Sequence, residues 1–396
     1  MNIGIISNLY PPDERGGAEL VASRIADELY RRGHRIFVVS TEPFSGFDSL
    51  KPHIVDERLG KVYRFFPLNL YHLTQANKHS FLTRLLWHFI DTVSGSSSSK
   101  LQHVLINEEP DVMITHNLKG IGLSMARTIQ EMGIRHIHTL HDVQLSVPSG
   151  LLIYKQENNF VNRSVFRRWY ESLVKKAIGT PDVVVSPSSF LMNFYQDRGF
   201  FASSSTQIIP NPAPNSYRVL RVERPEGPVR FLFVGQIEPH KGIEFLHNTL
   251  QYLPFDCELH IAGDGSLRPD VEAWAARDKR IFYHGFISLG HILQLMSNCD
   301  AVVLPSLCYE NSPTVIYEAF QVGVPVVASD IGGISELIEH GMNGLLFEPG
   351  NQDALTAALT DIEQKRTWFW DQTPKLRERA EKYAIEKYVD ALEKLF

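Results

Sequence analysis

Cysteine is scarce in this chain, and its spacing gives it no shared role. The 396 residues include three cysteines, Cys257, Cys299 and Cys308, and none of them belongs to a Cys-x-x-Cys pair. An odd number without that spacing indicates neither a disulfide framework nor a zinc site, and it fits a reducing cytoplasm.

Membrane-spanning and secretion signals are also missing. No apolar run approaches the length that crosses a bilayer. The N-terminus, Met1-Asn2-Ile3-Gly4-Ile5-Ile6-Ser7, lacks the positive n-region and the cleavage site of a signal peptide. We therefore expect a soluble cytoplasmic protein, at most a peripheral one at the inner face of the cytoplasmic membrane.

There is no basic excess either. The formal net charge of -6 and the pI near 6.2 argue against broad binding to nucleic acid. What is present is the composition of a globular protein, with 43% hydrophobic and 21% charged residues. A chain of this length exceeds one ordinary core, so we expect two domains.

Short apolar runs alternate with amphipathic stretches in the first half. Residues Ala18–Arg32 place apolar side chains at helical spacing, and Gly33 provides a natural stop. The expected strands are Ile3–Leu9, Ile36–Val39, Val112–Thr115, His136–Thr139 and Val183–Val185. This rhythm predicts a parallel sheet with helices on both faces. Residues Ser94–Ser99 are expected to form a flexible loop between two helical segments.

The rhythm breaks over residues 201–229, whose serines and prolines are typical of a linker. It then restarts with the expected strands Arg230–Val234, Leu259–Ala262, Ile281–Tyr283, Ala301–Leu304 and Val324–Ala328. We predict an α/β chain of two Rossmann-like, doubly wound domains, residues 1–214 and 215–377. Ligands bind such sheets at the carboxyl ends of the strands.

The first motif at a strand end is Gly16-Gly17-Ala18-Glu19. Paired glycines let the backbone approach a ligand, and a helix start offers free N–H groups to an anion. An ordinary flexible turn explains a lone Gly-Gly equally well. The Gly-x-Gly-x-x-Gly fingerprint of a nicotinamide-dependent oxidoreductase is absent after the first strand.

The second motif, Gly235–Gly242, follows the first strand of the second domain. It places Lys241 just before a helix, where its charge and the helix dipole suit a diphosphate. Taken alone, a solvated lysine is the simpler interpretation.

The third and strongest motif runs from Glu310 to Glu318. Ser312 is expected as the N-cap and Pro313 as the first residue of a helix, whose N–H groups form a second anion site. Glu318 lies on a helix that is otherwise apolar, and a carboxylate on a buried element needs a partner. The vicinal hydroxyls of a ribose would provide one.

The fourth motif is Thr139-Leu140-His141-Asp142, at the end of a strand in the first domain. A histidine there suits a sugar hydroxyl or a developing charge. His116-Asn117 has a similar but weaker position, and a single histidine is more often structural.

Taken together, these segments resemble the retaining glycosyltransferases of family 4, which have the GT-B fold with two domains facing across a cleft. The resemblance covers nearly the whole chain. It includes, besides the four motifs, Pro187–Phe190, Ile209–Pro212, Phe233–Gly235 and Ile261–Gly265, and it is most specific in Glu310 and Glu318 separated by seven residues.

The resemblance implies a role for each matching residue. Gly16 and Gly17 would present backbone N–H groups to the donor diphosphate, which Lys241 would also bind. Glu318 would hold the ribose. The remaining implied contacts are those of Glu310, Asn311, Ser312 and Pro313 with the transferred sugar and phosphate, of His141 with the donor sugar, and of backbone near Phe286 and Ile287 with the base.

One position departs from the family pattern. Gln236 stands where the family usually has arginine, so one cationic phosphate contact is missing. Three consequences are open. Arg15 or Arg268 supplies the missing positive charge, the enzyme binds its donor more weakly, or the enzyme is inactive or has an altered activity. We expect activity to survive, because Lys241 and both glutamates remain.

The family mechanism needs no covalent enzyme intermediate in most accounts and usually no metal. Electrostatic stabilisation of the leaving diphosphate carries the catalysis, with Glu310, His141 and Lys241 as the catalytic set. We expect no cofactor and no metal site. The resemblance implies transfer of a hexose-type sugar, most commonly from a UDP-sugar, to a glycan or lipid-linked oligosaccharide in exopolysaccharide or cell-surface polysaccharide assembly.

The first domain should bind the acceptor. Residues Arg163–Lys176 are basic and include Phe166, Trp169 and Leu173. Such a stretch suits an anionic membrane carrying a lipid-linked acceptor. The interpretation that we favour is a solvated helix whose apolar residues face the core. By analogy with the fold, a C-terminal helix over residues 378–396 packs back on the first domain.

Two other functions share this architecture. A nucleotide-sugar epimerase would convert the donor without an acceptor, and a non-catalytic nucleotide-sugar-binding protein would account for Gln236. We expect a monomer that binds no nucleic acid.

Overall fold

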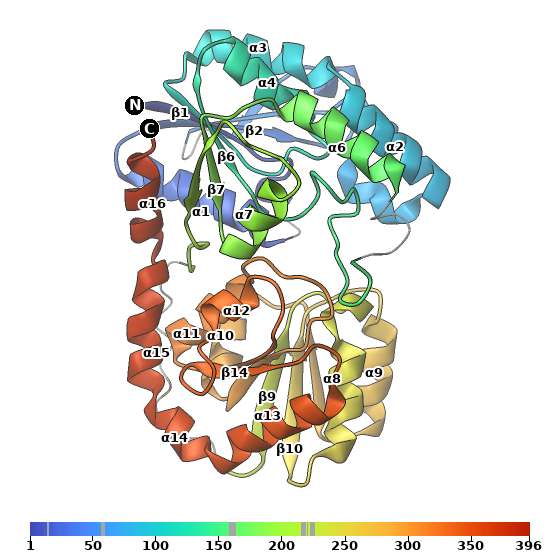
Figure 1. Ribbon diagram of the computed structural model, residues 1–396, viewed down its shortest axis with the longest axis vertical. Coiled ribbons are helices and arrows are strands. Elements are labelled where there is room, and N and C mark those ends of the chain that lie inside the picture. Colours follow the sequence, from blue (N-terminus) through green and yellow to red (C-terminus); the bar gives the residue numbers. More distant parts are fainter. Residues whose placement is uncertain (14–15, 57–59, 158–163, 215–218, 220, 222–225) are drawn as a thin grey trace. The chain divides into compact units, whose positions relative to one another are not determined.

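The computed structural model describes residues 1–13, 16–56, 60–157, 164–214, 219, 221 and 226–396 (Figure 1). It forms two compact units. Unit 1 consists of Met1–Leu151, Asn158–Pro210 and Ile385–Phe396, and unit 2 of Leu152–Glu157 and Asn211–Ala384.

Unit 1 is built on one eight-stranded sheet with the order β3-β4-β2-β1-β5-β6-β7-β8. Its strands are β1 (Asn2–Ile6), β2 (Arg35–Thr41), β3 (His53–Asp56), β4 (Lys61–Phe65), β5 (Val112–Thr115), β6 (Arg135–Thr139), β7 (Val183–Ser186) and β8 (Ser205–Ile208). Its α-helices are α1 (Gly17–Arg31), α2 (Phe81–Val93), α3 (Ser96–Glu108), α4 (Ser124–Glu131), α6 (Val165–Ile178), α7 (Ser189–Gln196) and α16 (Ile385–Glu393). Neighbouring strands are parallel except at the β3 edge, where β3 pairs antiparallel with β4.

The core of unit 1 follows from the apolar runs of its strands. The central residues of β1 and β5 are buried on both sides of the sheet, as parallel sheets require. Helix α1 buries Val21, Ile25 and Leu29 against the same core and ends before Gly33, which has a φ of 87°. The predicted helix and its glycine stop are therefore present.

The C-terminal helix α16 also belongs to this core. Its buried face carries Ile385, Tyr388, Val389 and Leu392, in the same apolar cluster as the buried face of α1. The predicted C-terminal helix of residues 378–396 begins only at Ile385, because residues 381–383 form a short 3₁₀ turn after α15.

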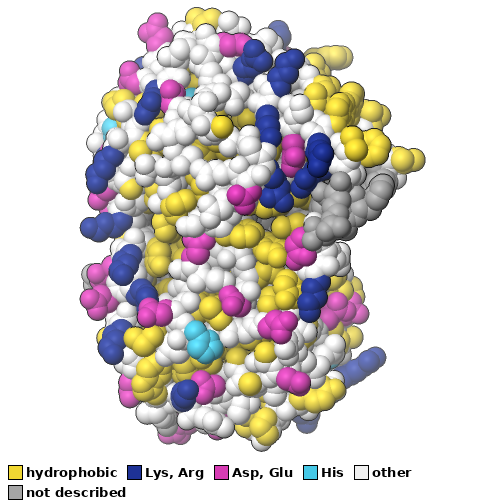
Figure 2. All heavy atoms as spheres, viewed as in Figure 1, with side chains coloured by type: hydrophobic (Ala, Val, Ile, Leu, Met, Phe, Trp, Pro, Cys, Tyr) yellow, Lys and Arg dark blue, Asp and Glu magenta, His cyan; other side chains and the backbone are white. Residues whose placement is uncertain are grey.

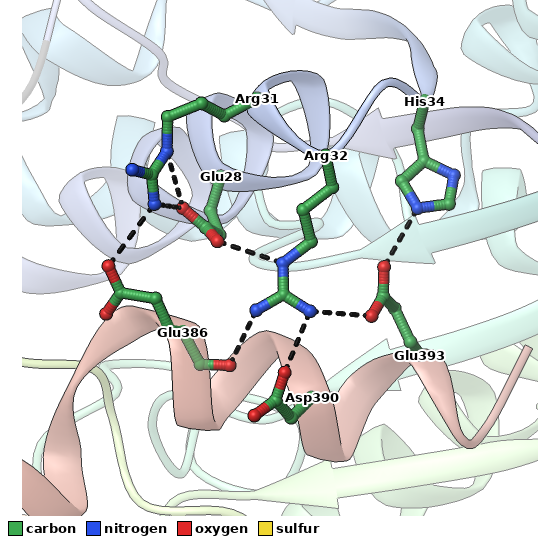
Figure 3. A network of polar contacts seen from close by, with 7 residues as sticks. All are labelled: Glu28, Arg31, Arg32, His34, Glu386, Asp390 and Glu393. Atoms are coloured by element: carbon green, nitrogen blue, oxygen red, sulfur yellow. Dashed lines mark hydrogen bonds and ion pairs between the residues drawn. The ribbon is translucent and has the colours of Figure 1, made fainter.

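Polar contacts join the surfaces of α1 and α16 (Figure 3). Arg32 donates to Asp390 at 2.9 Å, to Glu393 at 2.7 Å and to the backbone carbonyl of Glu386 at 2.8 Å. Its Nε donates to Glu28, which is almost fully buried. One arginine therefore links both helices through several charge-assisted bonds.

Unit 2 contains a six-stranded, fully parallel sheet with the order β11-β10-β9-β12-β13-β14. Its strands are β9 (Val229–Val234), β10 (Cys257–Ala262), β11 (Ile281–Gly285), β12 (Ala301–Leu304), β13 (Val326–Ser329) and β14 (Gly344–Phe347). Its α-helices are α8 (Ile243–Thr249), α9 (Arg268–Arg277), α10 (Leu289–Ser297), α11 (Thr314–Val322), α12 (Ile334–Leu337), α13 (Gln352–Gln364), α14 (Arg366–Asp371) and α15 (Thr373–Ala380). The order reverses between β9 and β12, which makes this pair the topological switch point of the unit.

The units divide differently from the predicted domains. The predicted boundary lies after residue 214, whereas the division falls between Pro210 and Asn211, and residues 152–157 join unit 2. Backbone pairing explains this excursion, because Ile153 bridges Cys308 and Tyr154 donates to the carbonyl of Leu307.

Two segments predicted as irregular are regular. Residues Ser96–Ser99 form the first turn of α3, where Ser97 is buried against Gly122 and Ser98 donates to Ser124. Within the predicted linker, Ser205–Ile208 forms β8, since its backbone completes the ladder of β7. Pro225, which also supported the linker prediction, lies outside the described residues.

Candidate functional site

The switch point of unit 2 brings Lys241 and Glu310 together. Lys241 ends the 3₁₀ turn Pro239–Lys241 after β9, and Glu310 lies in the loop after β12. The Lys241 ammonium donates to Glu310 Oε1 at 2.5 Å, and Ser306 Oγ donates to the same oxygen at 3.0 Å. Two charged groups 69 residues apart thus meet where an α/β sheet binds its ligands.

The surroundings keep this pair charged. Burial by itself disfavours both charges, but the Lys241 ammonium and the bonds from Lys241 and Ser306 outweigh it, so the pKa of Glu310 is held below its ordinary value. Burial likewise opposes the Lys241 charge, and Glu310 outweighs it, so the pKa of Lys241 is raised. The side chains retain 24% and 17% exposure, so a ligand can reach them.

Glycines set the loops around this pair. A Cβ on Gly242, which has a φ of 75°, would lie 1.9 Å from the carbonyl oxygen of Pro305. A Cβ on Gly332 would lie 2.3 Å from the carbonyl oxygen of Glu310, and the next residue, Gly333, donates its N–H to that oxygen at 2.7 Å. These close approaches fix the backbone beneath both charged groups.

Helix α11 begins one residue later than predicted. Pro313 occupies the N-cap and Thr314 is the first helical residue, so the prediction of Ser312 as N-cap is wrong. The Ser312 hydroxyl instead bonds with Tyr317 OH at 2.5 Å, because the extended conformation of Pro313 turns it away from the helix start. Asn311 lies in the same loop, and Glu318 is buried, with 6% exposure.

Hydrogen bonds between Glu238 and Ser266, a contact that we call the latch, join the loops after β9 and β10. Both carboxylate oxygens of Glu238 accept from Ser266, one from its N–H at 2.9 Å and one from its hydroxyl at 2.6 Å. A Cβ on Gly265 would lie 2.4 Å from the carbonyl oxygen of Ile237. Beside this latch, the Gln236 side chain is exposed.

The neighbouring loop after β11 carries the residues predicted to meet a base. Phe286 follows Gly285, which has a φ of 68°, and is 86% exposed, while Ile287 is half-buried. An exposed aromatic ring at the carboxyl end of a strand offers a flat apolar surface to a planar ligand.

Arg15 and Arg268 are the predicted substitutes for the arginine that Gln236 replaces. Arg15 lies outside the described residues. Arg268 donates to Glu272 at 2.8 Å and lies 3.8 Å from Asp264, so its charge is already shared between two carboxylates.

In unit 1, the Gly-Gly loop meets the start of α1 as predicted. Gly17 is the first helical residue and Gly16 is the N-cap. The N–H of Gly16 donates to Glu19 Oε2 at 2.9 Å, which leaves less of this loop for an anion than the sequence suggests. This is only the Glu half of a capping box, because Gly16 has no side chain to accept from the N–H of Glu19.

The two histidines of unit 1 contact each other. His116 follows β5 and His141 follows β6, and His116 Nδ1 lies 2.8 Å from His141 Nε2. Burial lowers the pKa of His141 to about 4, and burial together with His141 and His138 holds the pKa of His116 well below its ordinary value. The pair is therefore neutral at physiological pH, one ring donating and the other accepting.

A polar cavity of about 30 Å³ lies next to these histidines. Asp142, Lys119 and Asp91 line it together with the histidine pair. Burial raises the pKa of Asp142 to about 6 and that of Asp91 to about 7, and it lowers the pKa of Lys119. The volume suits water rather than a sugar ring.

A larger hollow of about 690 Å³ opens between the loops after β1 and β2. Residues Pro11–Asp13 and Glu42–Ser45 line it, together with the buried Arg64. Arg64 donates to Asp13 at 2.9 Å and to the carbonyl of Tyr10 at 2.8 Å, so it ties one wall of the hollow to β4.

Each unit therefore gathers its predicted residues at the carboxyl ends of its strands. Sequence reasoning missed Ser306, Glu238 and Lys119. The sequence did contain a signal for the first two, because Ser306 directly follows an expected strand and Glu238 lies within the Gly235–Gly242 motif. No feature of the sequence indicated Lys119. Among the described residues no group of three or more His, Cys, Asp or Glu is arranged to hold a metal ion.

Known proteins resemble both halves of the chain. Residues 15–215 match the model of Glycosyltransferase Family 4, and residues 221–387 match that of Glycosyl transferases group 1. A glycogen synthase of Mycobacterium tuberculosis is 33% identical over 91% of this chain and 86% of its own length. A Klebsiella pneumoniae protein described as an uncharacterized 42.6 kDa protein in the cps region is 26% identical over 85% of this chain and 87% of its own.

Solved structures share the fold. HepE of Anabaena, crystallised in complex with UDP, superimposes with a TM-score of 0.71 at 20% sequence identity, over 100% of this chain and 99% of that one. The chain therefore has the fold of that known structure. The chain belongs to the family 4 glycosyltransferases, enzymes of the GT-B fold.

Proposed function

We propose that this enzyme transfers a hexose-type sugar, with retention of configuration, from a UDP-sugar to a glycan or lipid-linked oligosaccharide. The product would enter exopolysaccharide or cell-surface polysaccharide assembly on the cytoplasmic side of the membrane. The single observation that carries the proposal is the ion pair of Lys241 and Glu310 at the switch point of unit 2.

The pair suits the two ends of a nucleotide sugar. Lys241 supplies a positive charge for the diphosphate, and the N–H groups at the start of α11 add to it. Glu310, ionised because its pKa is lowered, only accepts hydrogen bonds and therefore suits the sugar hydroxyls. When the diphosphate leaves, its growing charge is stabilised by groups that are already oriented.

The nucleoside end has its own residues. Glu318 on α11 would accept from the two ribose hydroxyls, and the loop with Phe286 and Ile287 would contact the base. Gln236 would add a neutral hydrogen bond, and the loop through Asn311, Ser312 and Pro313 would bind the sugar and phosphate. This division of roles is the one that the family resemblance implies.

Unit 1 would contribute His141 and the Gly16-Gly17 loop. A neutral His141, oriented by His116, donates or accepts without adding charge. The 690 Å³ hollow of unit 1 is large enough for an acceptor sugar, and exposed Phe44 offers that sugar an apolar face. The acceptor hydroxyl would attack on the face that the diphosphate leaves, and the leaving phosphate would take its proton.

The relatives support the choice of substrate class. HepE binds UDP in its crystal, and the Klebsiella relative is described as a protein of a cps region. We propose the nucleotide sugar as a substrate, with no resident cofactor or metal, and a monomeric enzyme.

A donor panel tests the proposal. Purified enzyme is incubated with UDP-, ADP-, GDP- and dTDP-sugars, with and without a glycan acceptor, and release of nucleoside diphosphate is measured. We expect UDP release that depends on acceptor, and NMR of the product should show the anomeric configuration of the donor. Epimerised donor without acceptor, or an inverted product, would contradict the proposal.

Matched variants test whether the switch point of unit 2 is the active site. Lys241→Met and Glu310→Gln should each lower kcat/KM by about 10²–10³-fold, the usual loss for one electrostatic contact to the transition state. Lys279→Met and Glu244→Gln, at exposed positions of the same unit, serve as controls. Equal activity in all four variants would exclude the switch point as the site.

A further inference from the structure

Two neighbouring helices of unit 1 expose an unusual number of large apolar side chains. On α2, Leu82 is 74% exposed, Leu85 58% and Phe89 49%. On α6, Phe166 is 76% and Trp169 53% exposed. We refer to these side chains, together with Leu86, Val93 and Val165, as the α2/α6 surface.

Each of the two helices is packed into unit 1 by its opposite face. The rings of Phe89 and Trp169 stack at 6.4 Å with an interplanar angle of 7°, which joins the two helices at the surface itself. Beneath them, Trp87 is buried and donates to the carbonyl of Tyr71 at 2.8 Å, and Val174 and Ile178 enter the interior. The exposed apolar residues therefore cannot simply turn inward.

The favoured sequence interpretation is wrong here. The apolar residues of the basic stretch were expected to face the core, yet Phe166 and Trp169 point outward. The inward face of α6 is instead made by Glu171, Val174 and Ile178, which follow one another at intervals of three and four residues. Arg163, the first residue of the stretch, lies outside the described residues.

The exposed charged side chains of α2 and α6 have one sign. Residues 60–90 contain no Asp or Glu, and the acids of α2 and α6, Asp91 and Glu171, are buried. Arg84, Arg168 and Lys176 are exposed on the two helices. In a chain of net charge -6, this is a local reversal of charge.

Figure 2 shows the combination on one face of the molecule. Hydrophobic side chains gather over α2 at the upper right, and dark blue Lys and Arg side chains lie next to them toward α6. Contiguous apolar surface of this kind marks an interaction site, and cations beside it select an anionic partner.

We propose that the α2/α6 surface docks this enzyme onto an anionic lipid bilayer. The apolar side chains enter the boundary between headgroups and acyl chains, and the cations bind the lipid phosphates. Trp169 suits that boundary, where one end of the indole is apolar and the other is wet. None of the helices in the described part of the chain combines the length and the apolar character of a membrane span.

This inference goes beyond the proposed function, because docking does not depend on which sugar is transferred. It adds a bilayer as a partner. It also predicts which part of the protein contacts the lipid. That part is unit 1, the unit to which we assign the acceptor.

Vesicle binding by the full chain tests the docking. We expect co-sedimentation with vesicles of phosphatidylcholine and phosphatidylglycerol, weak binding to phosphatidylcholine alone, and a decrease with salt. Lipids brominated along the acyl chains should quench tryptophan fluorescence, and Trp169→Phe should remove most of that quenching. Quenching that persists in Trp169→Phe would overturn the proposed orientation.

Two matched sets of variants separate the surface from the rest of the chain. Phe166→Ser/Trp169→Ser should weaken binding to anionic vesicles by about tenfold or more, whereas Phe47→Ser/Ile106→Ser, at exposed positions elsewhere in unit 1, should not. The second set changes charge. Binding to anionic vesicles should weaken by about fivefold or more for each cation lost in Arg84→Glu/Arg168→Glu/Lys176→Glu. The control makes the same charge change in unit 2, Arg277→Glu/Lys279→Glu/Lys375→Glu, and should weaken binding less.

Three results would overturn the inference. They are no binding to anionic vesicles, equal binding to neutral ones, or equal loss in surface and control variants. A dimer in sedimentation velocity that Phe166→Ser/Trp169→Ser dissociates would assign the surface to a second copy of the chain instead. Thermal unfolding of each variant confirms that it is folded before vesicles are added.

Discussion

Replacing Lys241 with methionine should destabilise the protein in a pH-dependent way. Methionine fills much of the lysine volume but leaves the Glu310 carboxylate without the ammonium now 2.5 Å away. Removing one member of a buried ion pair costs about 3–5 kcal/mol. Because both side chains remain about one fifth exposed, solvent screens part of this cost, and we expect about 2–3 kcal/mol at neutral pH.

The pH dependence follows from the pKa of Glu310. In the wild-type protein this pKa is lowered, so its contribution to stability is present above the unfolded-state pKa and is lost as the pH falls through the folded-state pKa. In Lys241→Met, burial remains while the ammonium is gone, so the pKa of Glu310 should rise above its ordinary value. The variant then loses stability as the pH rises, and its deficit relative to the wild type grows from acid to neutral pH.

Urea unfolding at several pH values between about 4 and 7, followed by circular dichroism, measures this deficit. Lys241→Met/Glu310→Gln should recover most of the loss, because it removes the stranded carboxylate, and Lys279→Met should behave like the wild type. A deficit that does not change with pH, or a double variant as unstable as Lys241→Met, would refute the reasoning.

Four further predictions concern the surrounding structure. Gly265→Ala should lower the melting temperature, costing about 1–3 kcal/mol, because its Cβ would lie 2.4 Å from a backbone carbonyl; unchanged calorimetric melting would contradict this. Burial lowers the pKa of His136 to about 4, so protonation of this one histidine should cost the wild type about 2 kcal/mol between neutral pH and about pH 5, and His136→Gln should reduce the pH slope in urea titrations by that amount. Arg32→Ala should speed hydrogen exchange across α16 more than across α4, as mass spectrometry would detect. Gln236→Arg should tighten UDP binding by about tenfold in calorimetry, since a charged donor replaces a neutral one; a large loss would mean that this loop is placed differently.

Much of the fold could be predicted because buried parallel strands leave a plain signal. Every expected strand has a counterpart, and Lys241 and Glu310 were chosen because each follows a strand. That the two would pair could not be predicted, since the contact depends on β9 and β12 being neighbours in the sheet. Only the order of strands brings those two loops together.

Other features depend on tertiary contacts that leave no local signal. Both carboxylate oxygens of Asp91 accept from the N–H of Gly120 and so hold the loop after β5. The sequence around Asp91 shows only a residue in a helical segment. Helical periodicity predicted α6 but not which of its faces would be buried, so Phe166 and Trp169 were placed inward. Ser312 has the preferred side chain for an N-cap, but the turn at Pro313 directs it to Tyr317 instead.

A crystal structure of the enzyme with UDP tests the central claim most directly. We predict that the diphosphate contacts the Lys241 ammonium and the N–H groups at the start of α11, with the ribose hydroxyls on Glu318. UDP bound away from the carboxyl ends of β9 and β12, with Lys241 still paired to Glu310, would contradict the account.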